Sequence, residues 1–304
     1  MSDAPFAWLD TRAYPFAPHY LALPDGARLH YVDEGQGPVL LFVHGTPSWS
    51  FEFRRQIRGL AGAYRCVAVD HVGFGLSDKP EHYDYRPQQH ARNLARLIEH
   101  LGLQDLTLIV HDFGGAIGLA YALDHPVNVR RLVVLNSWLW DASEMPEFKK
   151  IRPVLASPLL PWLYRWLNLS PRFLLPASFG ARPLVAAVRR QYTAPFGRPA
   201  ERHGPVGFAR ALLHEQPWFG SLWQRLPALR DTPVLLLWGM QDKLMGPAFL
   251  YQFAAAFRQP QVVELPTCGH VPQEEEAEAV LHHLHQFLAR EPPQFQRTQE
   301  QFNL

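Results

Sequence analysis

The sequence contains little of what several classes of protein require. Its 304 residues include only 2 cysteines, Cys66 and Cys268, which excludes a disulfide framework and fits a reducing compartment. No apolar stretch approaches the roughly 20 residues of a membrane-spanning helix. The N-terminal residues lack the cationic start and apolar run of a secretory signal. We therefore expect a cytoplasmic protein that makes no use of a membrane.

The chain also lacks an excess of charge of either sign. Lys and Arg number 29 and Asp and Glu number 28, which gives a formal net charge of +1. Proteins that bind nucleic acid or an anionic membrane surface usually carry a basic excess. The sequence therefore predicts neither of these partners.

Sequence signals for cofactors and metals are missing as well. The loop with Gly73 and Gly75 follows an apolar run, but no P-loop lysine follows it and a dinucleotide fingerprint would need a third glycine. His282, His283 and His285 are too close in sequence to converge from one helix on a single ion. We expect a structural turn and a solvated helix face, with no cofactor and no metal.

What the chain does have is an alternation of short apolar runs and helical patterns. Hydrophobic residues make up 47% and charged residues 19%, as in globular proteins. The predicted strands are residues 29–32, 39–43, 66–69, 106–110, 132–135, 234–238 and 262–265. Helical spacing marks residues 92–101 and 274–288. Continuous apolar strands separated by helices predict an α/β fold with a doubly wound, mostly parallel sheet.

One segment breaks this alternation. Residues 141–220 contain no clear strand, and prolines separate short helical pieces such as residues 160–167. We interpret this segment as a helical cap inserted over the carboxyl edge of the sheet, where open α/β sheets bind ligands. The predicted core is then residues 1–140 and 221–290, and residues 291–304 form a polar C-terminal tail.

The strongest chemical signal is Asp112. It ends the apolar run 106–110 and precedes the small residues Gly114 and Gly115, which predicts a strand, a sharp turn and a helix with the carboxylate at the apex. A carboxylate is a poor nucleophile toward an acyl carbon, because the product is an anhydride, but it attacks saturated carbon to give an alkyl ester. The alternative is a strand-end aspartate that caps the helix.

Three further segments follow predicted strands. The loop His44 to Trp49 would supply the backbone N–H of Thr46, and the N–H of Phe113 would complete an oxyanion or leaving-group site. Asp242 and His270 each lie just after a strand. The order Asp112, Asp242, His270 predicts a catalytic triad, in which His270 activates water and Asp242 orients the imidazole of His270. Asp141 and Glu144 are alternative acids, ranked below Asp242.

These motifs give the chain a resemblance to the haloalkane dehalogenase group of the α/β-hydrolase fold. The similar stretches are residues 31–35, 44–47, 70–80, 110–112 and 239–247. Epoxide hydrolases usually carry Gly two residues before the nucleophile, where this chain has Val110. The resemblance implies a hydrolase that acts on a small apolar electrophile with water as the second substrate.

The chain departs from that group at two positions. Such dehalogenases usually place Asn or Glu and Trp where this chain has Thr46 and Phe113, and those side chains contribute to halide binding. Trp49, Trp138 and Trp140 are the expected substitutes in the substrate pocket. Opening of an epoxide, with Tyr164 and Tyr192 as candidate acids, opening of a β-lactone, and a binding role without catalysis stay open as alternatives.

Overall fold

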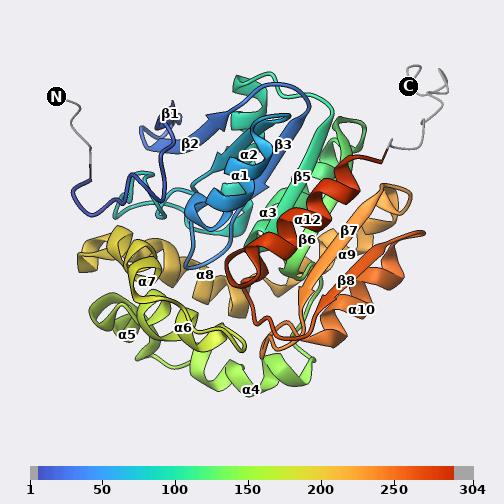
Figure 1. Ribbon diagram of the computed structural model, residues 1–304. Coiled ribbons are helices and arrows are strands. Elements are labelled where there is room, and N and C mark those ends of the chain that lie inside the picture. The colour runs from blue at the N-terminus through green and yellow to red at the C-terminus, as the bar shows by residue number, and fades with distance from the viewer. Residues whose placement is uncertain (1–5, 291–304) are drawn as a thin grey trace.

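Eight strands form one sheet in the order β1-β2-β4-β3-β5-β6-β7-β8 (Figure 1). The structure is a computed structural model, and it describes residues 6–290. β2 pairs antiparallel with β1 and β4, and all other neighbours in the sheet run parallel. The strands are β1 (His19–Ala22), β2 (Arg28–Glu34), β3 (Val39–Val43), β4 (Arg65–Val69), β5 (Leu106–Asp112), β6 (Val129–Ser137), β7 (Val234–Gly239) and β8 (Gln261–Leu265).

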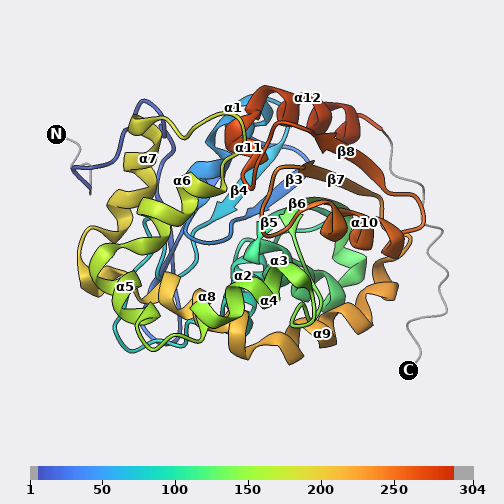
Figure 2. The ribbon, with the colours of Figure 1, turned by 90° about the horizontal axis from the view of Figure 1, so that it is seen from below.

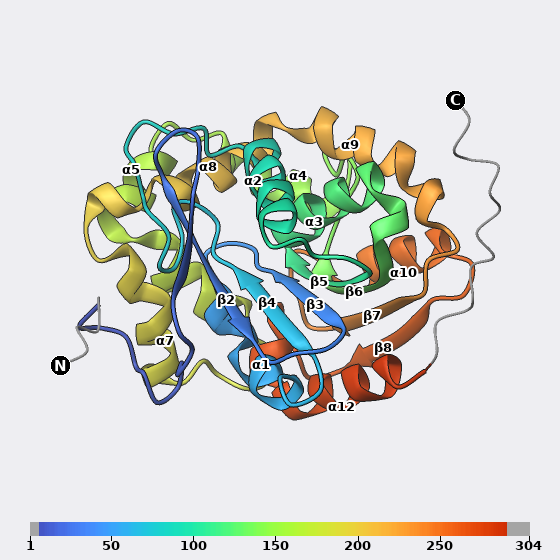
Figure 3. The same ribbon diagram turned by 90° about the horizontal axis from the view of Figure 1, so that it is seen from above.

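Helices cover both faces of this sheet. Figure 3 shows α2, α3, α9 and α10 on one face and α1 and α12 on the other. The helices are α1 (Arg54–Leu60), α2 (Pro87–His100), α3 (Phe113–Asp124), α4 (Pro146–Leu155), α5 (Leu160–Leu167), α6 (Leu175–Ser178), α7 (Ala186–Thr193), α8 (His203–His214), α9 (Gln216–Arg225), α10 (Pro247–Ala256), α11 (Pro272–Glu275) and α12 (Ala277–Leu288). Short helical turns are η1 (Ser50–Phe53), η2 (Pro126–Asn128), η3 (Ser170–Leu174), η4 (Ala194–Phe196), η5 (Pro199–Glu201) and η6 (Leu226–Leu229).

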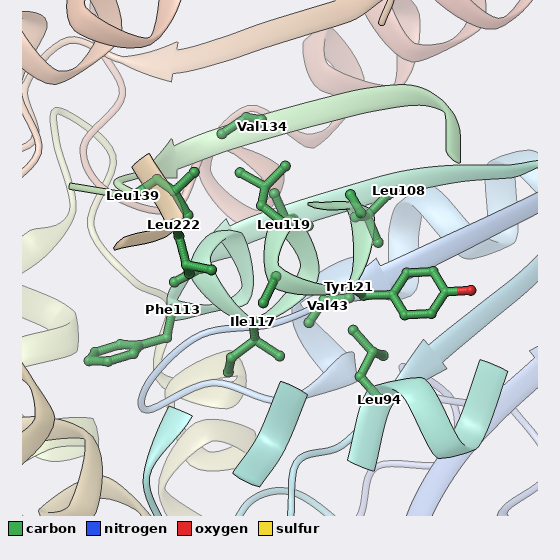
Figure 4. Close-up of a cluster of buried hydrophobic side chains, with 14 of the residues drawn as sticks. Val43, Leu94, Leu108, Phe113, Ile117, Leu119, Tyr121, Val134, Leu139 and Leu222 are labelled. Carbon is green, nitrogen blue, oxygen red and sulfur yellow. The ribbon is translucent and has the colours of Figure 1, made fainter. Parts of the chain in front are cut away.

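The central strands are apolar throughout because each of their faces meets a helix layer. In β5, Leu108 and Val110 belong to the core cluster beneath α2 and α3, whereas Ile109 belongs to the cluster beneath α1 and α12. This alternation is the two-residue period of a strand that is buried on both sides. Figure 4 shows the first cluster, with Ile117 and Leu119 of α3 among the side chains of the neighbouring strands and helices.

The predicted doubly wound sheet is confirmed, and every predicted strand corresponds to an observed one. The apolar run 39–43 matches β3, and each other observed strand is longer than its predicted run by one to five residues. β1 was not predicted. It is a four-residue edge strand that pairs only with β2 and is half-buried, so its sequence lacks both a continuous apolar run and a clear alternation.

The segment between β6 and β7 is helical and contains α4 to α9. Figures 1 and 2 show α4 to α8 gathered on one side of the sheet. The predicted cap boundary at residue 220 falls inside α9, which contacts α3 of the core. The predicted polar tail, residues 291–304, lies outside the described residues. Within residues 6–290, none of the helices combines the length and apolar character needed to cross a membrane.

Close approach of α3 to β3 depends on a glycine in the first turn of the helix. A Cβ atom at Gly114 would lie 2.0 Å from the carbonyl oxygen of Val43, so the backbone itself would have to move. We expect Gly114→Ala to lower the free energy of unfolding by about 1–3 kcal/mol or more, as overpacked sites do. Denaturation in urea measures this change.

Gly62 is the matched control for this substitution. A Cβ atom there meets no other atom within 4 Å, so Gly62→Ala should leave stability unchanged or raise it by a few tenths of a kcal/mol. Equal unfolding midpoints for the two variants would contradict the close approach of α3 to β3.

Candidate active site

Asp112 occupies the sharp turn that joins β5 to α3. Its φ of 51° and ψ of −127° lie outside the regions that residues with a side chain normally adopt. The hydroxyl of Ser137 donates a 2.7 Å hydrogen bond to the Asp112 carbonyl oxygen. A Cβ atom at Gly45 would lie 2.4 Å from the Asp112 side chain, so the loop after β3 closes on the carboxylate. The turn therefore holds a strained residue whose side chain faces that loop.

Asp112, Asp242 and His270 come together from three strand ends, as their order in the sequence predicted they would. His270 Nδ1 lies 2.7 Å from Asp242 Oδ2, and His270 Nε2 lies 4.0 Å from Asp112 Oδ2. The imidazole thus stands between two carboxylates, hydrogen-bonded to one and within reach of the other. This arrangement can hold a proton on His270 or deliver it to a group bound beside Asp112.

Three further donors, two from the loop after β7 and one from β6, fix the Asp242 carboxylate. The backbone N–H groups of Leu244 and Met245 donate to Oδ1, at 2.9 and 3.1 Å. The side-chain amide of Asn136 donates to Oδ2 at 3.0 Å, and the Asn136 carbonyl oxygen accepts from the N–H of Gly239. Asn136 was not predicted from the sequence. Its only signal was a polar residue at the end of the apolar run 132–135.

Burial and mutual charge shift the pKa values of all three groups. Burial alone would lower the pKa of His270, but the charge and hydrogen bond of Asp242, together with the charge of Asp112, raise it to about 9. Burial alone would raise the pKa of Asp242, yet His270 and the backbone donors lower it to about 2. Burial raises the pKa of Asp112 despite the nearby histidines. His270 is therefore protonated at neutral pH.

A second buried pair, Glu52 and His111, lies behind His270. His111 Nε2 is 2.8 Å from the carbonyl oxygen of His270, which can only accept, so Nε2 carries a proton. His111 Nδ1 lies 3.1 and 3.2 Å from the two carboxylate oxygens of the fully buried Glu52. One more proton must occupy this contact, either on Nδ1 or on the carboxyl group. The pair is thus neutral as a whole and holds the backbone of His270 in place.

Thr46 and Phe113 lie where the sequence placed them, on either side of Asp112. The Thr46 N–H donates a 2.8 Å hydrogen bond to Asp112 Oδ2. The Thr46 hydroxyl is buried without a hydrogen-bond partner. Phe113 opens α3, so its N–H has no acceptor within the helix. Both residues line one cavity with Asp112 and His270.

This cavity has a volume of about 370 Å³, within the range of small-molecule sites. Its walls are largely aliphatic and come mainly from the helical segment between β6 and β7, with Leu155, Leu160 and Leu212 among them. Tyr164 and Ser170 add hydroxyl groups. Burial first, and the charge of Asp112 in addition, raise the pKa of Tyr164 to about 12. The site is therefore an apolar pocket with a carboxylate, a histidine and a few hydroxyl groups at one end.

The three tryptophans expected in the substrate pocket do not line this cavity. The Trp49 N–H donates to the carbonyl oxygen of Gln191, and the Trp140 N–H is directed at the sulfur of Met145. The Trp138 ring packs edge-on against Phe113, with ring centroids 4.8 Å apart. All three are buried in the core, because large aromatic rings stabilise the packing there.

Of the remaining residues that the sequence suggested for the site, one lines the cavity and the others lie elsewhere. Tyr164 faces the cavity, whereas the hydroxyl of Tyr192 donates to Glu274 outside it. The alternative acids lie on the surface, where Asp141 accepts from the N–H of Ser143 and Glu144 pairs with Lys149. Asp242 is the acid that reaches His270.

The high pKa of His270 should depend on both carboxylates. We expect Asp242→Asn and Asp112→Asn each to lower it from about 9 toward 6.5, because each removes a negative charge beside the imidazole. The ion pair of His270 with Asp242 stabilises the fold fully at pH values below the pKa of His270 in the unfolded chain, which is near 6.5. This stabilisation is lost as the pH rises through the pKa of His270 in the folded protein, about 9. NMR titration of His270 measures the pKa, with Asp78→Asn as a distant control. An unchanged pKa in both site variants would contradict this electrostatic description.

Comparison with known proteins identifies the family. Residues 38–277 match the model of the alpha/beta hydrolase fold. Haloalkane dehalogenase 2 of Mycobacterium tuberculosis is 36% identical over 88% of this chain and 93% of its own. Cis-3-alkyl-4-alkyloxetan-2-one decarboxylase of Xanthomonas campestris is 35% identical over 92% and 98%. The crystal structure of haloalkane dehalogenase DatA from Agrobacterium tumefaciens superposes with a TM-score of 0.79, at 27% identity over 92% and 99% of the two chains. The chain belongs to the α/β-hydrolase fold family and is an enzyme with haloalkane dehalogenase-like relatives.

Proposed function

We propose that Asp112 attacks a saturated carbon of an apolar substrate and forms an alkyl ester. The carboxylate stands in a cavity with largely aliphatic walls, 4.0 Å from a histidine that a second carboxylate orients. Attack on saturated carbon gives an ester, and where the bound substrate carries no group that can expel Asp112 again, water activated by His270 hydrolyses it. A binding protein without catalytic activity is less favoured, because binding alone would require neither the strained backbone at Asp112 nor the placement of the Asp112 and Asp242 carboxylates on either side of His270.

The charges at the site change in a direction that favours this two-step scheme. Before the reaction, Asp112 is among the groups that raise the pKa of His270 to about 9. When Asp112 becomes an ester, its negative charge disappears and the pKa of His270 falls. The histidine then gives up its proton more readily and can act as a base at the step that needs one.

For the substrate we propose an oxetan-2-one, that is, a β-lactone. The observation that carries this choice is the set of donor side chains that line the cavity: Thr46, Tyr164, Ser170 and Ser178 carry hydroxyl groups and Lys243 an ammonium group, and no indole or side-chain amide among the described residues lines it. A departing halide depends on such N–H donors for stabilisation. The carboxylate released from a β-lactone spreads its charge over two oxygens, stays attached to the substrate and leaves with relief of ring strain.

The chemistry of such a substrate balances without water. Asp112 forms a bond to the ring carbon that bears the ring oxygen, and that carbon–oxygen bond breaks to leave a free carboxylate. Backside attack places the new ester bond antiparallel to the bond that joins the carboxylate to the neighbouring carbon. Loss of CO₂ then sends the electron pair into a carbon–carbon double bond and expels the Asp112 carboxylate. A cis-disubstituted lactone gives a cis-alkene by this route.

The relatives support both this function and a second candidate. Proteins of Xanthomonas campestris and Shewanella oneidensis, 35% and 33% identical, are named as decarboxylases of an oxetan-2-one. Haloalkane dehalogenation is the second candidate, because a relative named as a haloalkane dehalogenase is 36% identical. That reaction also requires attack of a nucleophile on saturated carbon. Epoxide opening is less favoured, because only Tyr164 of the two candidate acids faces the cavity.

The fate of the ester separates the two candidates. In His270→Ala, an alkyl ester from a bromoalkane should persist and appear as added mass on the intact protein, because its hydrolysis needs a base. The same variant should still convert a cis-3,4-dialkyl β-lactone to alkene and CO₂. Asp112→Asn is the control and should do neither. Absence of both adduct and alkene in His270→Ala, with turnover in the wild type, would contradict the nucleophile assignment.

The donor set should decide how well a halide leaves. We expect weak halide release by the wild type and an increase of about tenfold or more in Phe113→Trp combined with Thr46→Asn, because a restored hydrogen bond to a charge contributes about 1.5–3 kcal/mol. Halide release from bromoalkanes and chloroalkanes measures this. Lactone turnover by the same variant is the control for folding. Fast wild-type halide release that the double substitution leaves unchanged would favour dehalogenation with other halide-binding groups.

A further inference from the structure

The outer surface of the cap holds most of the exposed large apolar side chains of the described chain. Eleven such side chains are exposed, and eight of them lie between residues 154 and 185. Single exposed apolar residues are normal, but a cluster of this kind marks an interaction surface. We define the cap patch as Val154, Leu159, Trp162, Trp166, Phe173 and Leu174.

The members of the cap patch lie close together and reach the cavity. Trp162 and Trp166 are four residues apart in α5 and share one face of that helix, and Leu159 directly precedes the helix, three residues before Trp162. Their fractional exposures are 64%, 53% and 55%. Val154 and Leu174 are exposed and also line the cavity at Asp112. Figure 1 shows α4, α5 and α6 at the lower edge of the molecule, with no other described element beneath them. Two members of the patch therefore belong both to the outer surface and to the wall of the cavity.

The stretch of sequence that carries the patch contains charged residues of one sign. Residues 148–190 contain eight Lys and Arg and no Asp or Glu, whereas the rest of the chain has 21 Lys and Arg against 28 Asp and Glu. A net charge of +1 conceals this asymmetry. Lys150, Arg152, Arg172, Arg189 and Arg190 are exposed and make no ion pair with any described residue. Glu81 and Glu144 pair with Arg165 and Lys149, and the segment that carries the patch still has an excess of positive charge.

We propose that the cap patch docks on the surface of an anionic lipid bilayer. Tryptophan is enriched at the boundary between lipid and water, and exposed Lys and Arg are attracted to anionic headgroups. A second copy of the chain fits this surface poorly, because a two-fold contact would bring the same positive charges against each other. This proposal goes beyond the proposed function, and membrane binding can be tested without measuring enzymatic turnover. It departs from the sequence analysis, in which the small net charge predicted no membrane partner.

Docking in this orientation gives the cavity a direct source of apolar substrate. The opening beside Val154 and Leu174 would face the acyl chains, where a lactone or haloalkane with alkyl chains concentrates. Such a substrate would pass from lipid to the aliphatic walls around Leu155 and Leu160 without crossing water. The enzyme would remain peripheral to the membrane.

Vesicle binding tests the proposal with the full chain. Sedimentation would compare vesicles of phosphatidylcholine alone with vesicles that also contain phosphatidylglycerol, at low and high salt. We expect binding to the anionic vesicles, weakened by salt because the attraction between charges is screened. Binding that does not depend on the anionic lipid, or no binding at low salt, would overturn the proposal.

Two pairs of variants locate the binding surface. Trp162→Ser with Trp166→Ser, and Arg189→Glu with Arg190→Glu, should each lower the vesicle partition coefficient by about tenfold or more. Their matched controls, Val127→Ser with Tyr251→Ser and Arg58→Glu with Arg230→Glu, alter exposed residues outside the cap and should bind as the wild type does. Equal loss in patch and control variants would overturn the assignment of the surface.

Two further measurements keep this proposal separate from the proposed function. Turnover of a water-soluble, short-chain substrate should be unchanged in the patch variants, since Trp162, Trp166, Arg189 and Arg190 do not line the cavity. Loss of that turnover in variants that still bind vesicles would overturn the placement of the docking surface. Light scattering that shows a dimer lost on the same substitutions would assign the patch to self-association and likewise overturn the membrane proposal.

Discussion

The contact of His270 with two carboxylates is the interaction around which the rest of the site is built. A buried imidazolium is costly unless negative charge accompanies it, and here Asp242 lies 2.7 Å from one ring nitrogen and Asp112 lies 4.0 Å from the other. Each carboxylate needs its own supports. Asn136 and two backbone N–H groups hold Asp242, and the Thr46 N–H holds Asp112. The loops after β3 and β7 and the end of β6 therefore contribute to one charge balance.

That balance also explains the buried Glu52–His111 pair. A full negative charge on Glu52 without a partner would add a third carboxylate near His270 and make Asp112 harder to ionise. Because the contact with His111 holds an extra proton, the pair presents no net charge to the site. It still supplies a rigid donor to the His270 carbonyl oxygen. The Glu52–His111 pair thus fixes the position of the His270 backbone, whereas Asp242 and Asp112 determine the charge on its imidazole.

The sequence was informative wherever a side chain's place follows from the end of a strand. Asp112, Asp242 and His270 follow predicted strands of a parallel sheet, and such ends meet at one edge. Side-chain packing gave no comparable signal. Trp49, Trp138 and Trp140 have the right chemistry for a pocket, but burial in the core stabilises them more than exposure to a cavity would. Asn136 and Glu52 were missed because their roles depend on contacts across more than 50 residues of sequence.

The cap shows the same limit on a larger scale. Its helices were predictable from prolines and the absence of strands, and the apolar cavity walls follow from their buried faces. The basic character of its outer face was not predicted, because the net charge of the whole chain sums a basic segment and an acidic remainder. Only the fold shows that Trp162 and Trp166 are exposed and do not belong to the core. A cap that is apolar on both faces but charged around its edge can join a water-excluding pocket to a lipid surface.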